Sequence, residues 1–214
     1  MAKKDYHRIN TIAVLVSILE TRDENINGHS LHILKLADTF YDEMPLSYHL
    51  KLNRNDLHLA AILHDIGQSC VPVDTIGKPG KLTTDEMQTI KQHTEVSCAI
   101  MELAGGCDKI LDGVKYHHER IDGKGYYGLK GKKIPLISRI LAILDTFSAV
   151  TVSKTYKPAR TYEEGITTLK LGMGTQFDAE LVEIFASIPE SRIKECLDYV
   201  NDSVKKLADK GVIL

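Results

Sequence analysis

The chain has no long hydrophobic run and no excess of either charge. Of its 214 residues 43% are hydrophobic, yet no apolar stretch approaches the roughly 18 residues that a membrane-spanning helix needs. The net charge is −2, so the basic surface that binds polymeric nucleic acid is lacking. The first ten residues contain no apolar core of a signal peptide. We therefore expect a cytoplasmic protein that binds neither a membrane nor polymeric nucleic acid.

Paired cysteines and strand patterns are also scarce. The four cysteines show no CxxC spacing, so we expect reduced thiols that mostly serve as small core residues. The alternation of apolar and polar residues that is typical of β-strands is nearly absent. Because 214 residues suffice to bury a core, we predict one all-α domain. Residues 1–187 would form its main part, and residues 188–214 a C-terminal helical extension of the same domain.

Apolar residues recur at helical spacing along most of the chain. The pattern predicts helices over residues 10–20, 29–40, 55–65, 85–104, 109–118, 135–150 and 162–171, and two more over 178–214 that are broken at Pro189. Prolines and glycines predict irregular loops over residues 71–82 and 119–135. Thr83 or Thr84 is expected to cap the helix that follows the first loop.

The segment AAILHDIG, residues 60–67, places an adjacent histidine and aspartate at the end of an apolar helix face. Burying the Asp65 carboxylate without a partner would be costly, so an opposite charge is expected nearby. Neutral imidazole and carboxylate together are ordinary ligands of first-row divalent metals. The alternative is a helix end at which His64 acts as a cap and Asp65 faces water.

Other histidines and a second acid lie on separate predicted elements and complete a set of five histidines and two aspartates: His29, His64, Asp65, His93, His117, His118 and Asp145. Such a set suffices for two metal ions that share a bridging carboxylate, and its histidines favour Fe, Mn, Zn or Ni over Mg or Ca. Two ions about 4 Å apart can activate water and clamp a phosphoryl group. In isolation His29 could be a surface residue, and His117–His118 an exposed pair before a loop. Asp145 is harder to dismiss, because apolar residues surround it.

The ordered series His29, His64–Asp65 and Asp145 resembles the signature of the HD metal-dependent phosphohydrolases. Further segments resemble the HD-GYP subfamily: HDIGQSCVPVDTIGKPGKLT, KQHTE, HHERIDGKGYYGL, IPLISRILAILDTFSAV and GTQFDAELV. This similarity covers about residues 12–185. It implies an HD-domain helical bundle with a metal centre in its core. It also implies a phosphodiesterase that hydrolyses a cyclic dinucleotide, with cyclic di-GMP the first candidate, by attack of a metal-bridging hydroxide.

The same resemblance implies a role for each candidate residue. One metal would take His29, His64, Asp65 and Asp145, and the second would take Asp65 as a bridge with His93, His117 and His118. Two divalent ions are implied, with iron or manganese favoured over zinc or nickel. Asp65 and Gln68 occupy the catalytic positions, while Gly125, Tyr126, Lys154 and Lys157 would contact the nucleotide and its phosphates. A signalling protein or a second copy of the chain is the macromolecular partner to consider.

The chain departs from the family pattern in the substrate shell. The namesake tripeptide reads Gly125-Tyr126-Tyr127, so tyrosine replaces a proline that would fix the backbone. Gln68 stands where lysine is usual, which weakens charge stabilisation at the phosphate. Lys154 stands where arginine is usual and gives up bidentate geometry.

Three further departures concern the residues Thr155, Ser148 and Asn25, which replace proline, a second aspartate and glutamate. Because three-metal members carry the glutamate, a third metal is not expected here. Two alternatives to a cyclic-dinucleotide phosphodiesterase stay open: a phosphohydrolase for another phosphoester, and a nucleotide-binding or signalling module with little turnover. A di-iron oxygenase is a third hypothesis, which the phosphate-contacting lysines disfavour.

Overall fold

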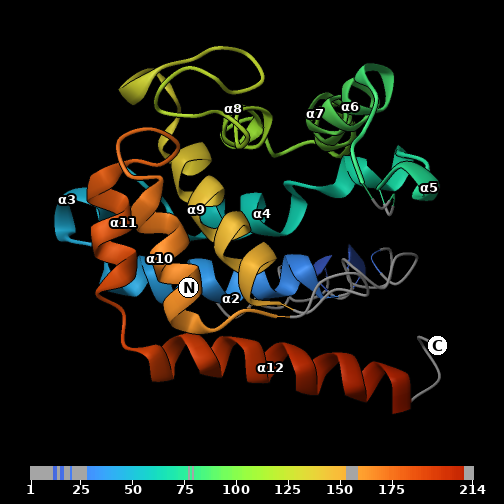
Figure 1. Ribbon diagram of the computed structural model, residues 1–214. Coiled ribbons are helices and arrows are strands. Elements are labelled where there is room, and N and C mark those ends of the chain that lie inside the picture. Colours follow the sequence, from blue (N-terminus) through green and yellow to red (C-terminus); the bar gives the residue numbers. More distant parts are fainter. Residues whose placement is uncertain are drawn as a thin grey trace.

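The protein is described by a computed structural model that covers residues 12–13, 15–16, 20, 28–76, 78, 80–152 and 159–209. Its elements, in chain order, are α2 (His29–Glu43), α3 (Leu46–His49), α4 (Arg54–Leu63), η1 (Ile66–Cys70), α5 (Val73–Ile76), α6 (Thr84–Lys91), α7 (His93–Ala104), α8 (Leu111–Lys115), η2 (Gly131–Lys133), α9 (Leu136–Thr151), α10 (Tyr162–Leu171), α11 (Ala179–Ala186) and α12 (Glu190–Asp209) (Figure 1). Within these described residues, β-pairing is limited to one bridge between Met173 and Phe177. The predicted all-α class is confirmed.

The core lies between α2, α4, α9 and α11. Three buried phenylalanines join α2, α9 and α11. The ring of Phe185 on α11 contacts Phe40 on α2 and Phe147 on α9, with centroid distances of 5.3 and 5.0 Å. Both contacts are edge-to-face, the geometry that the charge distribution of aromatic rings favours. None of the described helices is both long and apolar enough to cross a membrane.

Helix starts follow from local capping. Thr83 and Thr161 each form a capping box, in which the threonine hydroxyl accepts a backbone N–H and a glutamate three residues later accepts the threonine N–H. Thr83 is therefore one of the two caps that the sequence predicted for α6. Gly105, in a conformation with φ of 71°, ends α7 at Ala104, which is the predicted end of this helix.

Two predicted helices are shorter than expected. The helix expected over residues 85–104 is divided at Gln92 into α6 and α7, and the one expected over 109–118 ends at Lys115. Neighbouring residues on an α-helix point about 100° apart, whereas the turn after α8 brings the rings of His117 and His118 to a centroid distance of 4.0 Å. Both breaks therefore lie next to histidines that are needed on one side of the fold.

The last helix, α12, packs along α2 (Figure 1). Ile193, Cys196 and Val200 of α12 are buried, and a Cβ atom on Gly28 would lie only 2.9 Å from Val200 Cγ1. Arg192 also pairs with Asp42 at 3.2 Å. The described part of the C-terminal segment is thus held against the core, and the proposed division at residue 187 stays a prediction.

The short helix η1 sits unusually close to α7, and this contact brings the segment with Asp65 up to His93. A Cβ atom on Gly67 would lie 2.2 Å from the carbonyl oxygen of His93 and 2.7 Å from Ser97 N. The Gly67 N–H donates to Ser97 Oγ at 2.9 Å, and that hydroxyl donates to the carbonyl of His64 at 2.9 Å. Only glycine permits this approach, because any side chain would collide with backbone atoms that cannot move aside.

Gly67→Ala should therefore separate η1 from α7 and lower the free energy of unfolding by about 2 kcal/mol or more. Gly131→Ala is the control, because its Cβ atom would meet nothing within 4 Å, so only the cost of its left-handed backbone, about 1 kcal/mol, is expected. Urea unfolding of both chelator-treated variants makes the comparison. Equal losses for the two variants would contradict the importance of the η1–α7 contact.

Candidate metal centre

Asp65 lies at the centre of the histidine cluster, and its two oxygens face different partners. Oδ1 lies 3.1 Å from His93 Nε2 and 3.5 Å from His117 Nε2. Oδ2 lies 3.4 Å from His64 Nε2 and 4.0 Å from His29 Nε2. One carboxylate therefore has a histidine pair on each side, the arrangement that a bridging ligand between two cations requires.

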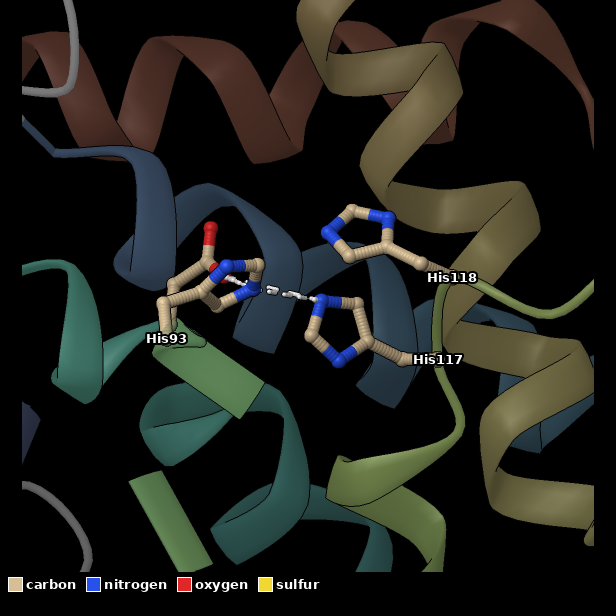
Figure 2. Close-up of side chains that lie close together, drawn as sticks. His93, His117 and His118 are labelled. Carbon is tan, nitrogen blue, oxygen red and sulfur yellow. Dashed lines mark hydrogen bonds and ion pairs between the residues drawn. The ribbon is translucent and has the colours of Figure 1, made fainter. Parts of the chain in front are cut away.

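Among the described residues, two groups hold ligand atoms within 4.8 Å of one another: Asp65 with His93, His117 and His118, and His29 with His64 and Asp145. These are the seven residues that the sequence analysis selected, and the structure brings all of them together. In the second group, His29 Nε2 lies 3.3 Å from Asp145 Oδ1. Figure 2 shows part of the first group, with the ring of His93 opposite those of His117 and His118.

The seven side chains come from segments far apart in the chain. His29 and His93 are the first residues of α2 and α7, and Asp145 lies within α9. His64 and Asp65 link α4 to η1, while His117 and His118 follow α8. Because ligands at helix ends can turn inward without interrupting a helix face, the surrounding helices keep their apolar residues for the core.

Three of the histidines are held in the orientation of a metal ligand. In each, Nδ1 donates to the carbonyl oxygen of the residue three positions earlier, at 2.9 Å for His64, 2.5 Å for His93 and 2.6 Å for His117. A carbonyl oxygen can only accept, so Nδ1 carries the proton. When the ring is neutral, its Nε2 lone pair is left to face the cluster, which is the arrangement seen for histidines that bind metals.

The electrostatics of the cluster reflect the shared carboxylate. Burial alone would lower the pKa of His64, but the adjacent Asp65 raises it to about 9. Burial would raise the pKa of Asp65, yet His64, His117 and His93 hold it well below its usual range. Burial lowers the pKa of His118 to about 3, with a further contribution from His117. The cluster thus combines an ionised Asp65 with one histidine whose pKa is raised, His64, and one whose pKa is lowered, His118.

A divalent cation fits these residues. His64 Nε2 is buried and has no hydrogen-bond partner among the described residues, although it lies 3.4 Å from Asp65 Oδ2. Imidazoles outnumber carboxylates in the set, which suits a first-row transition metal. Gln68 supports the bridging acid, because its side-chain amide donates to Asp65 Oδ2 at 2.5 Å. Gln68 therefore contacts a ligand of the cluster.

The glycine-rich loop is tied to the cluster by Glu119, which the sequence analysis missed. This buried carboxylate accepts the N–H of Tyr127 at 2.5 Å and that of Leu129 at 2.6 Å. A proline at position 127 has no N–H and could not form the first bond. An acid directly after two candidate ligands, at the start of a loop with four glycines, was the available signal.

Tyr126 and Tyr127 lie differently. Tyr127 is anchored, since its hydroxyl is 2.8 Å from Thr94 Oγ1. The Tyr126 ring instead lies over His118 with a centroid distance of 4.8 Å, and Lys91 Nζ is 5.0 Å from the same ring. A Cβ atom on Gly125 would lie 2.5 Å from Glu119 Cα, so the loop folds tightly onto the segment after α8.

Several sequence predictions fall outside the described residues. Lys154 and Lys157, the predicted phosphate contacts, lie there together with Thr155 and Asn25. Ser148 lies within the described residues, and its hydroxyl is 3.3 Å from His29 Nδ1.

The fold is a helical bundle, and its histidine–aspartate cluster is arranged around the Asp65 carboxylate as in proteins that bind metal ions. Residues 13–181 match the model of the family described as HD domain, and the chain belongs to this family. It is 34% identical over 188 residues to a probable cyclic di-GMP phosphodiesterase of Vibrio cholerae, covering 81% of this chain and 43% of the relative. It is 30% identical over 170 residues to a 3′3′-cGAMP-specific phosphodiesterase of the same organism, covering 78% and 39%.

A solved structure of a cyclic GMP-AMP-specific phosphodiesterase from V. cholerae has the same fold, with a TM-score of 0.65 and 16% identity over 95% of this chain and 55% of the other. The resemblance noted in the sequence is thereby confirmed. The chain spans about two-fifths of the length of the two sequence relatives.

Metal binding should release protons, because His64 must lose its proton to offer Nε2 and its pKa is about 9 in the protein without metal. We expect the affinity for Zn²⁺ to rise between pH 7 and about 9. Titration calorimetry in two buffers of different ionisation enthalpy measures the released protons. His49→Gln, which alters a histidine outside the cluster, should release as many as the wild type. Identical heats in both buffers and a pH-independent affinity would contradict this expectation.

Proposed function

We propose that the chain is a metal-dependent phosphodiesterase that hydrolyses a cyclic dinucleotide, with cyclic di-GMP as the first substrate to test. The observation that carries this proposal is the Asp65 carboxylate with a histidine pair on each side. The similarity to a probable cyclic di-GMP phosphodiesterase and to a 3′3′-cGAMP-specific phosphodiesterase supports the substrate class.

The two groups of ligand atoms support the proposal of two divalent ions. One would be held by His29, His64, Asp65 and Asp145, and the other by Asp65, His93, His117 and His118. Iron and manganese suit these ligands best, and zinc and nickel are alternatives. When bound, such a pair activates water and neutralises the charge of the phosphoryl group.

The chain's own residues have defined tasks in this proposal. Asp65 holds the two halves of the site at a fixed separation, and Gln68 orients the Asp65 carboxylate through its amide. The carbonyl partners hold a proton on Nδ1 of His64, His93 and His117. Because these rings are buried, their orientation is set before substrate arrives, which lowers the reorganisation needed during phosphoryl transfer.

We further propose that Tyr126, on the backbone turn made by Gly125, stacks on a base of the nucleotide. Its ring is partly buried over His118, next to the Lys91 ammonium group. Lys91 has no carboxylate partner within ion-pair distance among the described residues, so its charge is available for a phosphate. The two groups would bind different parts of one nucleotide. Lys91, the last residue of α6, would supply a positive charge that Gln68 lacks.

Asp65→Ala should remove both bound metal and hydrolysis, since it deletes the ligand that both groups share. Elemental analysis and separation of the products of cyclic di-GMP should be carried out on one anaerobically purified sample. Asp108→Ala, an exposed aspartate outside the cluster, is the matched control and should keep both properties. Hydrolysis by Asp65→Ala without bound metal would refute the proposal. Two metals without product in the wild type would favour another phosphoester or a nucleotide-binding module.

Tyr126→Ala should raise KM about 10-fold or more while leaving metal content unchanged, because stacking of an aromatic ring on a base contributes about 1–3 kcal/mol. Tyr126→Phe retains the ring and should remain within about 2-fold of the wild type. Steady-state kinetics at constant metal content provide the measurement. Equal KM values for the alanine variant and the wild type would remove Tyr126 from the binding site.

A further inference from the structure

His29 differs from His64, His93 and His117 because, among the described residues, no backbone carbonyl accepts a hydrogen bond from its ring. Its Nδ1 lies 3.3 Å from the hydroxyl of Ser148, while its Nε2 lies 3.3 Å from Asp145 Oδ1. Asp145 and Ser148 are three residues apart on α9 and therefore share a helix face. One turn of α9 thus contacts both ring nitrogens of His29. A hydroxyl, unlike a carbonyl, can donate or accept, so Ser148 alone does not decide where the His29 proton resides.

The second partner of Ser148 is His32, which lies one turn after His29 on α2. His32 Nδ1 is 2.9 Å from Ser148 Oγ, and both side chains are buried. Burial lowers the pKa of His32 to about 3, so the ring is neutral and keeps one lone pair. His32 is not among the seven candidate ligands that the sequence analysis selected. The structure makes it the end of a chain of three groups that starts at a metal ligand.

The direction of this chain follows from counting protons. If Nε2 of His29 binds a metal, the neutral ring carries its proton on Nδ1 and donates to Ser148 Oγ. The Ser148 hydroxyl then donates to His32 Nδ1, because its side-chain partners among the described residues are these two histidines. His32 therefore carries its own proton on Nε2, a buried atom that has no hydrogen-bond partner among the described residues. The reverse direction would put a proton on His29 Nε2, where it would block the ligand position.

We propose that Ser148 and His32 are positioning residues that hold His29 in its metal-binding tautomer. Ser148 accepts the hydrogen bond that His29 Nδ1 donates, and His32 Nδ1 accepts the hydrogen bond that the Ser148 hydroxyl donates. At His29 a hydroxyl and a neutral imidazole thus take the place of the backbone carbonyl oxygens that orient His64, His93 and His117. It concerns only the group formed by His29, His64 and Asp145. The inference rests on the metal centre of the proposed function, but it does not depend on hydrolysis or on the identity of the substrate.

The first test is the tautomer of His32 in the full chain loaded with Zn²⁺. Long-range ¹H–¹⁵N correlation spectra distinguish a ring protonated on Nε2 from one protonated on Nδ1. We expect His32 to be protonated on Nε2 and His29 on Nδ1. A zinc-loaded protein whose His32 is protonated on Nδ1 would overturn the proposal, whatever the activity of the same sample.

The second test measures zinc affinity in Ser148→Ala against Ser138→Ala. Ser138 is also a buried serine of α9, but its hydroxyl donates to the carbonyl of Gly113 at 2.8 Å and touches no candidate ligand. Loss of a group that orients a metal-binding histidine typically lowers affinity about 10- to 100-fold. We expect that loss for the site formed by His29, His64 and Asp145 in Ser148→Ala, with the affinity of Ser138→Ala within about 3-fold of the wild type.

His32→Leu extends the test to a residue whose side chain is hydrogen-bonded to Ser148 and to none of the seven candidate ligands. It should weaken the same site as Ser148→Ala, with the other site unchanged, and the double variant should be no weaker than Ser148→Ala alone. The proposed chain of hydrogen bonds would be refuted if Ser148→Ala bound zinc as tightly as the wild type. It would also be refuted if Ser148→Ala and Ser138→Ala lost the same zinc affinity. A wild type that binds no zinc would instead refute the metal centre itself, so the two failures can be told apart.

Discussion

The architecture depends on burying the carboxylate of Asp65 among imidazole rings. An ionised acid removed from water is costly unless it is paired, and here its two oxygens are shared between His93 and His117 on one side and His64 and His29 on the other. The remaining elements serve this contact. Gly67 lets η1 approach α7, and the breaks beside α7 and α8 turn histidines inward.

The departures from the family pattern have local counterparts in the structure. Tyr127 stands where proline is usual, but its N–H is bound by Glu119 and its hydroxyl lies beside Thr94, so the loop is fixed by hydrogen bonds in place of a fixed backbone angle. Gln68 stands where lysine is usual and supports Asp65 through an amide. Ser148 stands where a second aspartate is usual and joins His29 to His32. Each change keeps a hydrogen bond to the centre or its loop while removing a charge or a rigid ring.

Much of the secondary structure was predictable because apolar periodicity and capping are local. The helix over residues 162–171 is observed with the predicted bounds, and Thr83 caps α6. The errors lie at α7 and α8, where a continuous helical pattern conceals a break, and within residues 71–82, where the predicted loop contains the four-residue helix α5. The breaks lie beside His93 and His117, which belong to the cluster. Helical propensity is a local property of the sequence and does not reflect such a tertiary contact.

The sequence by itself determined which seven side chains form the cluster, because histidines and buried acids in an apolar setting are chemically conspicuous and the family series orders them. The family resemblance already implied how they divide around Asp65. Only the tertiary structure decided which nitrogen of each ring faces the centre, and that Glu119, Ser148 and His32 support it. The physical reason is that a proton's place on a ring depends on a partner within about 3 Å. Those partners lie on α2, α9 and the loop after α8, which come together only when the chain is folded.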